Sequence, residues 1–242
     1  MSIHCDLRRI YGALAASLPR GEDPDNDASV SFHRGNLPVP PDELHSDQLV
    51  LCKGEHVYNG WYRADAVSIE LGHRTARELG LFLLACMFHG PARDVWLRFD
   101  HPDSQVRHLV VPCNPFDGPL EARPTMMPCA LRYHPSEPFK HPWTWQQLHP
   151  EELPLLALTT VDQTPASDED WRRRDTLRQA SSYEGTLRFG ELLLNAGCPI
   201  YEQREYALEG DAGFRGVAPM SAEITLWLPG SFGWGGRDGL ER

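Results

Sequence analysis

Hydrophobic and polar residues alternate along several short stretches of the chain. In residues 65–71, Val67, Ile69 and Leu71 share one side, and the residues between them are polar or charged. Such alternation is typical of a strand with one buried face, because successive side chains of a strand point to opposite sides. By the same criterion, further strands are predicted at 48–52, 55–62, 94–99, 105–111, 200–210 and 222–230.

Other stretches repeat their apolar residues at helical spacing. The clearest is 73–89, which is apolar on most sides and lies between Gly72 and Gly90. A helix of that kind is expected to be buried, and glycine followed by proline is expected to end it. Two more helices are predicted at 168–179 and 182–196, each beginning beside serine residues that can cap a helix.

These elements predict an α+β fold of mainly antiparallel sheets packed with a few helices. The segments 73–111 and 182–229 each contain a helix followed by a two-strand ribbon, which suggests an αββ duplication. In the first ribbon the strands flank a short polar loop, as in a hairpin. A chain of 242 residues can bury a core of its own, so we expect a single domain over 1–242.

Proline separates the two halves of the chain. Residues 112–165 hold 11 of the 21 prolines, and proline cannot donate a backbone hydrogen bond to a helix or sheet. We therefore expect an irregular segment, either a connector or a packed cap, with short extended pieces at 129–134 and 155–161 that can pair at sheet edges. Residues 21–47 are rich in turn-forming and acidic residues and are expected to be a loop.

Charge and cysteine usage narrow the choice of partner and compartment. Acidic residues outnumber basic ones by 34 to 23, giving a formal net charge of −11. This charge repels nucleic acid and anionic membranes and favours basic partners, although it also simply keeps proteins in solution. The six cysteines include no C-x-x-C pair, and the first 20 residues lack the apolar core of a signal peptide. We therefore expect reduced thiols and a cytoplasmic protein that binds neither nucleic acid nor membrane.

The sequence contains no motif that specifies a reaction. A G-x-S-x-G elbow, a P-loop and an H-E-x-x-H helix are all absent, so no enzymatic activity, catalytic residue, cofactor or metal is predicted. Histidines in loops leave one alternative open, because histidine is a common zinc ligand, although surface histidines need no metal. These histidines form two groups, His101 with Asp103 and His108, and His134 with His141 and His149.

A longer segment at 58–96 reads YNGWYRADAVSIELGHRTARELGLFLLACMFHGPARDVW. In it, an aromatic–Gly–Trp stretch and an arginine lead into a long helix and then a tryptophan. This pattern resembles the immunity proteins of bacterial polymorphic-toxin and type VI secretion systems, in particular the class paired with restriction-endonuclease-like nuclease toxins. The resemblance covers about a sixth of the chain. It implies a protein without turnover that binds its cognate toxin in the cytosol and blocks the toxin.

For the toxin-binding surface we choose the acidic second ribbon, because acidic inhibitors can cover a basic nuclease cleft. Its charged residues and aromatic anchor are Glu202, Glu205, Glu209, Asp211 and Trp227. The same acids can also be read as a solvated face, and Trp227 alternates with Ile224, Leu226 and Leu228, so one of the two sets faces away from the main core. Two other functions stay open, a metal-dependent hydrolase that uses the loop histidines and an adaptor subunit of a bacterial assembly. The sequence does not set the oligomeric state.

Overall fold

A computed structural model of the chain describes residues 5–18, 30–32, 34–56, 62–111, 129–133, 143–145, 156–160, 176–181, 183–197, 205–207 and 223–228. The helices in these segments are α1 (Leu7–Ser17), α2 (His73–His89) and α4 (Tyr183–Ala196). The strands are β1 (Cys5–Asp6), β2 (Val30–Phe32), β3 (Glu43–Ser46), β4 (Leu49–His56), β5 (Tyr62–Leu71), β6 (Val95–Phe99), β7 (His108–Val111), β8 (Cys129–Tyr133), β9 (Trp143–Trp145), β10 (Leu156–Thr160), β11 (Thr176–Ser181), β12 (Glu205–Ala207) and β13 (Glu223–Trp227).

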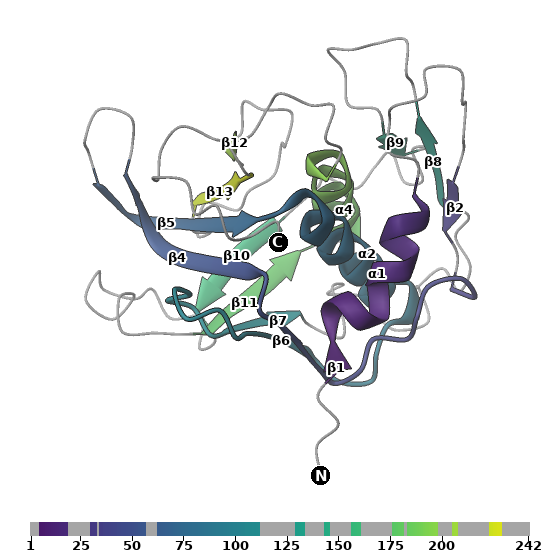
Figure 1. Ribbon diagram of the computed structural model, residues 1–242, viewed down its shortest axis with the longest axis horizontal. Coiled ribbons are helices and arrows are strands. Elements are labelled where there is room, and N and C mark those ends of the chain that lie inside the picture. The colour runs from purple at the N-terminus through teal and green to yellow at the C-terminus, as the bar shows by residue number, and fades with distance from the viewer. Residues whose placement is uncertain are drawn as a thin grey trace.

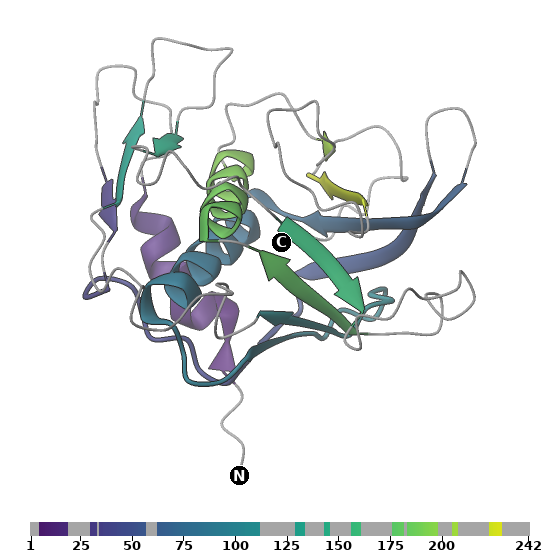
Figure 2. The same ribbon diagram turned by 180° about the vertical axis from the view of Figure 1, so that it is seen from behind.

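The described strands form three sheets. A six-stranded sheet has the order β1-β3-β6-β7-β11-β10, a four-stranded sheet has the order β12-β13-β5-β4, and a three-stranded sheet has the order β2-β8-β9. Figure 1 shows the two larger sheets one above the other, with the three helices beside them and the smallest sheet beyond the helices; Figure 2 gives the view from behind. Side chains from both larger sheets and from the helices join one hydrophobic core cluster.

The α+β class is confirmed, but the prediction of mainly antiparallel sheets is wrong, because the larger sheets are mixed. Parallel pairs join β1 with β3, β3 with β6, β7 with β11, and β5 with β13. Parallel neighbours need a crossover connection in place of a tight turn. A hairpin pattern in the sequence reveals only strands that are close along the chain, so it could not indicate these distant pairs.

The helix predicted at 73–89 is confirmed with the same bounds as α2. Gly72 precedes it in an extended conformation, and Gly90 ends it in the left-handed region with a φ of 51°. There the N–H of Gly90 donates to the carbonyl oxygen of Cys86 at 3.0 Å, a conformation that glycine adopts without strain. Every residue of 75–87 is buried, as the apolar pattern predicts. Among the described helices, even α2 lacks the length and hydropathy that a bilayer-spanning helix needs.

The helix predicted at 182–196 is confirmed as α4, whereas the helix predicted at 168–179 is wrong over its last residues, 176–179. Thr176–Ser181 form strand β11, which pairs with β7 on one side and β10 on the other. Residues 168–175 lie outside the described part. Helix propensity is a weak preference, and hydrogen bonds from two neighbouring strands override it.

Most predicted strands are present with shifted bounds. The two strands predicted at 48–52 and 55–62 correspond to a single strand, β4, with an irregularity between Lys53 and Glu55, and to the first residue of β5. The hairpin is confirmed as β6–β7, and the two extended pieces of the proline-rich segment contain β8 and β10, of which β10 lies at a sheet edge. The expected loop at 21–47 contains β2 and β3, and α1 was not predicted.

The described elements contain the same ββαββ order twice. The first unit is β4, β5, α2, β6 and β7, and the second unit is β10, β11, α4, β12 and β13. The two strands after each helix form a ribbon that joins the hairpin ahead of the other helix, because β7 pairs with β11 and β13 pairs with β5. The strands β6-β7-β11-β10 of one sheet therefore match β12-β13-β5-β4 of the other.

The pairing registers of the two units agree as well. In the first unit, Ala66 lies seven residues before the start of α2 and pairs with Glu223, the first residue of β13. In the second unit, Thr176 lies seven residues before the start of α4 and pairs with His108, the first residue of β7. In both hairpins, the last residue of the second strand pairs with the first residue of the strand before it. The structure thus shows two ββαββ units that exchange their ribbons.

Helices α2 and α4 pack against each other in opposite directions. Nδ1 of His73, at the start of α2, lies 3.0 Å from the carbonyl oxygen of Ala196, at the end of α4. Gly80 and Gly190, each the eighth residue of its helix, meet where the helices cross. A Cβ on Gly80 would lie 3.0 Å from the carbonyl oxygen of Gly190. Equivalent residues therefore meet each other, as expected on the axis of a twofold pseudo-symmetry.

A carboxylate is buried between α1 and α2. The side chain of Glu78 is 2% exposed, and its Oε1 accepts a hydrogen bond from Nε of Arg74 at 2.9 Å. Gly12 of α1 leaves room for this pair, because a Cβ there would lie 2.9 Å from Nη2 of Arg74. Loss of solvation raises the pKa of Glu78, although the hydrogen bond and charge of Arg74 act in the other direction.

We expect Glu78→Gln to gain stability relative to the unchanged protein as the pH rises. A carboxyl group whose folded-state pKa is raised contributes stability that is fully present below its unfolded pKa and is lost as the pH rises through the folded-state pKa. Glutamine does not titrate, so it keeps its contribution at all pH values. Urea unfolding of both proteins from about pH 4 to about pH 8 measures the difference.

Glu43→Gln serves as the control for this experiment, because it removes a carboxylate whose side chain is 49% exposed. The raised pKa of Glu78 is contradicted if the unchanged protein gains stability over Glu78→Gln with increasing pH. That result would mean that the ion pair with Arg74 outweighs the loss of solvation.

Candidate functional site

The six-stranded sheet turns one face toward the core and the other away from it. In β6, Val95, Leu97 and Phe99 are buried, whereas Trp96 is exposed and Arg98 is partly exposed. Strand β3 alternates in the same way, with its first residue exposed and its second buried. We call the side that carries Trp96 the outer face. Strands β3, β6 and β7 are neighbours, so their outward side chains lie beside one another.

Trp96 is the aromatic centre of the outer face. In the described part of the chain, the exposed large hydrophobic side chains are Val39 and Trp96, and Trp96 is 39% exposed. Its ring meets the ring of His108 edge-on, with centroids 5.7 Å apart and planes at 77°. Its partners across the strands are Glu43 of β3 and Val110 of β7, which is fully buried. The indole therefore contacts His108 of β7 and remains partly exposed to solvent.

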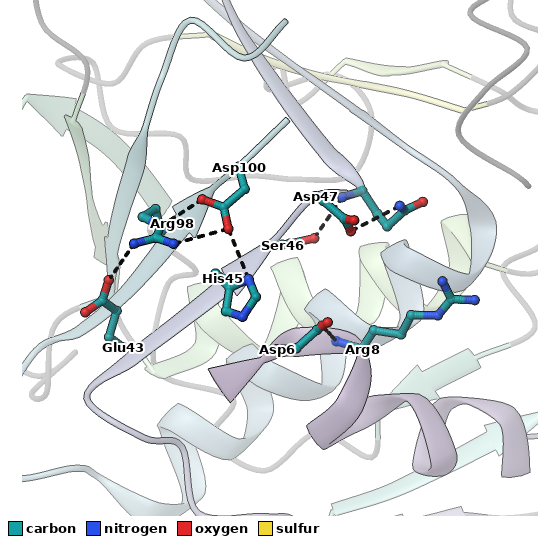
Figure 3. Close-up of polar contacts among 9 residues, drawn as sticks. Asp6, Arg8, Glu43, His45, Ser46, Asp47, Arg98 and Asp100 are labelled. Carbon is teal, nitrogen blue, oxygen red and sulfur yellow. Dashed lines mark hydrogen bonds and ion pairs between the residues drawn. The ribbon is translucent and has the colours of Figure 1, made fainter. Parts of the chain in front are cut away.

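Four ionisable side chains of the outer face form a connected network, the charged frame, which consists of Glu43, His45, Arg98 and Asp100 (Figure 3). Nε of Arg98 lies 2.8 Å from Oδ1 of Asp100, and Nη1 of Arg98 lies 3.7 Å from Oε1 of Glu43. Nδ1 of His45 lies 3.0 Å from Oδ2 of Asp100. Asp100 is thus the main partner of Arg98, and the carboxylate of Glu43 is held at longer range.

Contacts within the charged frame shift the pKa values of Asp100 and Arg98. Partial burial acts to raise the pKa of Asp100, but the hydrogen bond and charge of Arg98, together with His45, outweigh it and lower the pKa. The hydrogen bond to Asp100 in turn raises the pKa of Arg98. A lowered carboxyl pKa means that the pair is intact above the ordinary aspartate pKa and is lost only as the pH falls through the lowered value. The Arg98–Asp100 pair is therefore ionised at neutral pH.

Short-range hydrogen bonds fix the backbone beside the frame (Figure 3). The Oγ of Ser46 accepts from the N–H of Gln48 at 3.2 Å, and Oδ1 of Asp6 accepts from the N–H of Arg8 at 2.7 Å. Asp6 is the N-cap of α1, a position where a carboxylate satisfies a free helix N–H group. Because Asp6 pairs with His45 across β1 and β3, this helix start adjoins the outer face.

The residues predicted to bind a toxin lie mostly outside the described part of the chain. Glu202, Glu209 and Asp211 are not among the described residues. Glu205 and Trp227 are partners in register across β12 and β13 of the four-stranded sheet. The structure brings this one pair together and places it on a different sheet from Trp96.

Strand β13 is buried on both faces at its centre. Ile224, Leu226 and Leu228 are at most 3% exposed, and Thr225, which alternates with them, is 0% exposed. A second layer therefore covers the side of β13 that carries Thr225.

Of the two histidine groups predicted as an alternative metal site, the described one, His101 with Asp103 and His108, does not form a metal cluster. The N–H of Asp103 donates to Nδ1 of His101 at 3.2 Å, whereas His108 packs on Trp96. Within the described residues, no three His, Cys, Asp or Glu side chains are grouped as a metal site requires. The other predicted group lies outside them and consists of His134, His141 and His149.

The sequence held a signal for Trp96 that the prediction did not use. In the alternating strand at 94–99, Trp96 and Arg98 fall opposite the apolar side formed by Val95, Leu97 and Phe99. A tryptophan on the polar side of such a strand is informative, because an exposed large apolar side chain is less expected than a buried one. The acidic residues of the second ribbon favour Trp227 as the anchor when the sequence alone is considered.

Comparisons with protein-family models, with curated proteins and with solved structures gave no match to this chain. What the outer face can do therefore follows from its own chemistry. It offers an exposed indole, a half-exposed carboxylate and an arginine already paired with an aspartate. Aromatic and arginine side chains of this kind are enriched at the energetic centres of protein–protein interfaces.

Proposed function

We propose that this protein is an immunity protein that binds and neutralises a cognate bacterial toxin in the cytoplasm without enzymatic turnover. The observation that carries the proposal is the exposed indole of Trp96, held on the outer face beside the charged frame. The toxin is taken to be a nuclease effector, and the outer face is the surface that it covers.

The arrangement on the outer face matches the physics of an interface hot spot. Binding energy concentrates in a few large side chains, most often tryptophan, tyrosine and arginine, that lose solvent contact when the partner docks. Trp96 is such a side chain, and its orientation is already set by His108. A pre-oriented side chain loses less conformational freedom on binding, so more of the contact energy appears as affinity.

Charge supports a basic protein as the partner. The net charge of −11 attracts a protein of opposite sign and accelerates their encounter. A nuclease needs a basic surface to bind its polyanionic substrate, so it offers that sign. The segment 58–96, which resembles immunity proteins of this class, contains α2 and ends at Trp96.

Coexpression with the toxin encoded beside this gene tests the proposal. We expect growth to be restored in cells that the toxin alone kills, and we expect the purified proteins to form a complex of about nanomolar affinity by calorimetry. Val39→Ala, which shortens the other exposed large hydrophobic side chain of the described residues, should protect as well as the unchanged protein. The proposal is wrong if no neighbouring gene product binds, or if the chain protects cells without binding.

A further inference from the structure

We propose that Trp96 and Glu43 form a subsite for an arginine side chain of the partner protein. This inference rests on the proposed function only in taking the occupant to belong to a protein. In the complex, the guanidinium group lies over the exposed indole of Trp96 and directs N–H groups to the carboxylate of Glu43.

The two residues are direct neighbours across the sheet. Glu43 of β3 pairs in register with Trp96 of β6, and neighbouring strands of a sheet lie about 4.8 Å apart. Both side chains reach solvent, with Trp96 39% exposed and the Glu43 side chain 49% exposed. A cation binds an aromatic ring when it lies within about 6 Å of the ring centroid. A cation over the indole is therefore also within reach of the carboxylate.

The strand on the other side of Trp96 holds the indole in place. His108 of β7 contacts the ring edge-on, with 5.7 Å between centroids. Val110, the partner of Trp96 across β6 and β7, is fully buried. The contact with His108 restricts the indole on the β7 side, whereas Glu43 lies on the β3 side. An incoming side chain thus meets an aromatic surface that is already oriented.

The balance of charge leaves room for one more cation. Arg98 donates to both oxygens of Asp100, at 2.8 Å and 3.4 Å, and lies 3.7 Å from Glu43. One arginine therefore serves two carboxylates, and it is bonded to only one of them. Glu43, Asp100 and Arg98 together therefore carry one more negative than positive charge. An arginine from the partner neutralises that charge.

Arginine satisfies both members of the subsite better than other side chains. An apolar side chain would cover Trp96 but would also remove water from the Glu43 carboxylate without replacing it, which is unfavourable. A lysine ammonium pairs with a carboxylate but has no plane to stack on the indole. The planar guanidinium stacks on an aromatic ring and can donate two parallel hydrogen bonds to a carboxylate.

Nuclear magnetic resonance of the full-length protein tests the subsite without the toxin. The probe is N-acetyl-arginine amide, and its control is N-acetyl-citrulline amide, which has nearly the same shape and no charge. The indole N–H signal of Trp96 is identified by its loss in Trp96→Phe. We expect the arginine probe to shift this signal and the citrulline probe to leave it in place.

Two carboxylate variants locate the second half of the subsite. Glu43→Gln should weaken the response to the arginine probe by about threefold, the range expected for one exposed ion pair. Asp103→Asn is the matched control, because the side chain of Asp103 is 50% exposed and lies in the β6–β7 loop. The inference is overturned if the arginine probe gives no charge-specific shift, or if Glu43→Gln responds as the unchanged protein does.

The complex with the toxin separates this inference from the proposed function. We expect Trp96→Ala to weaken that complex at least tenfold, as removal of a hot-spot side chain does. A toxin that binds Trp96→Ala and the unchanged protein equally well overturns the arginine subsite and leaves the immunity function intact. An arginine-specific shift of the Trp96 signal, without any toxin complex, overturns the immunity function and supports the subsite.

Discussion

Replacing Leu97 by alanine should lower the free energy of unfolding by about 2–5 kcal/mol, whereas replacing the adjacent Trp96 should cost about 1 kcal/mol. Leu97 is 0% exposed and belongs to the hydrophobic core cluster, so its truncation leaves a cavity among close-packed side chains. Trp96 is the larger residue, but it lies on the outer face and is 39% exposed. The order of the two effects is therefore the reverse of the order of side-chain size.

Urea unfolding of the two variants, followed by circular dichroism, measures this contrast. A native-like spectrum for Trp96→Ala would also show that its weaker toxin binding does not result from unfolding. If Trp96→Ala is as destabilising as Leu97→Ala, the indole supports the fold, and the outer face loses its aromatic centre as a binding surface.

Gly80→Ala should lower the free energy of unfolding by about 1–2 kcal/mol, although alanine is the better helix former by about 1 kcal/mol. The new Cβ would lie 3.0 Å from the carbonyl oxygen of Gly190 and 3.1 Å from Cγ of Leu194. The first contact is with the backbone of α4, so relief requires the two helices to separate. Separation disturbs the packing of both helices along their contact.

Gly190→Ala is the matched variant at the equivalent position. Its Cβ would meet Cδ2 of Leu84 at 3.2 Å, which is the end of a side chain that can move, and would lie 3.6 Å from the carbonyl oxygen of Gly80. We therefore expect Gly190→Ala to leave stability unchanged or to raise it by about 1 kcal/mol. Thermal and urea unfolding of the two variants measure the difference, and equal effects of the same sign would contradict the asymmetry of the crossing.

Local features of the fold could be predicted from the sequence because local residues determine them. Helix α2 was predicted with its bounds, since its apolar run is flanked by Gly72 and Gly90. The alternation of β5 and the hairpin β6–β7 was equally readable. Helix α1 also carries a readable signal, because its buried residues Leu7, Tyr11 and Ala15 recur at helical spacing.

The pairing of distant strands could not be predicted. Thr176–Ser181 contains arginine and glutamine, which suit a helix, and becomes a strand because β7 and β10 flank it. The three residues His108–Val110 pair with it from a distant part of the sequence. Nothing within either segment specifies the other, so the exchange of ribbons becomes apparent only in the structure.

The sequence and the structure point to candidate binding residues of the same kind. An aromatic anchor with charged neighbours on a two-strand ribbon was expected at Trp227, and the outer face has this combination at Trp96 on the ribbon of the first unit. Composition could not separate the two ribbons, because both carry a tryptophan and charged residues. The exposure of Trp96 depends on how the whole sheet packs, so it becomes apparent only in the structure.

Because the chain is synthesised from its N-terminus, the exchange of ribbons leaves one edge of β5 unpaired during synthesis. β5 leaves the ribosome well before β13, which covers its second edge. Until then β5 is paired only with β4, and an open strand edge can pair with another chain. A second nascent copy offers a suitable strand, because the first unit contains both a hairpin and a ribbon. The pairing of β13 with β5 is therefore the step after which another copy of the chain can no longer pair with this edge of β5.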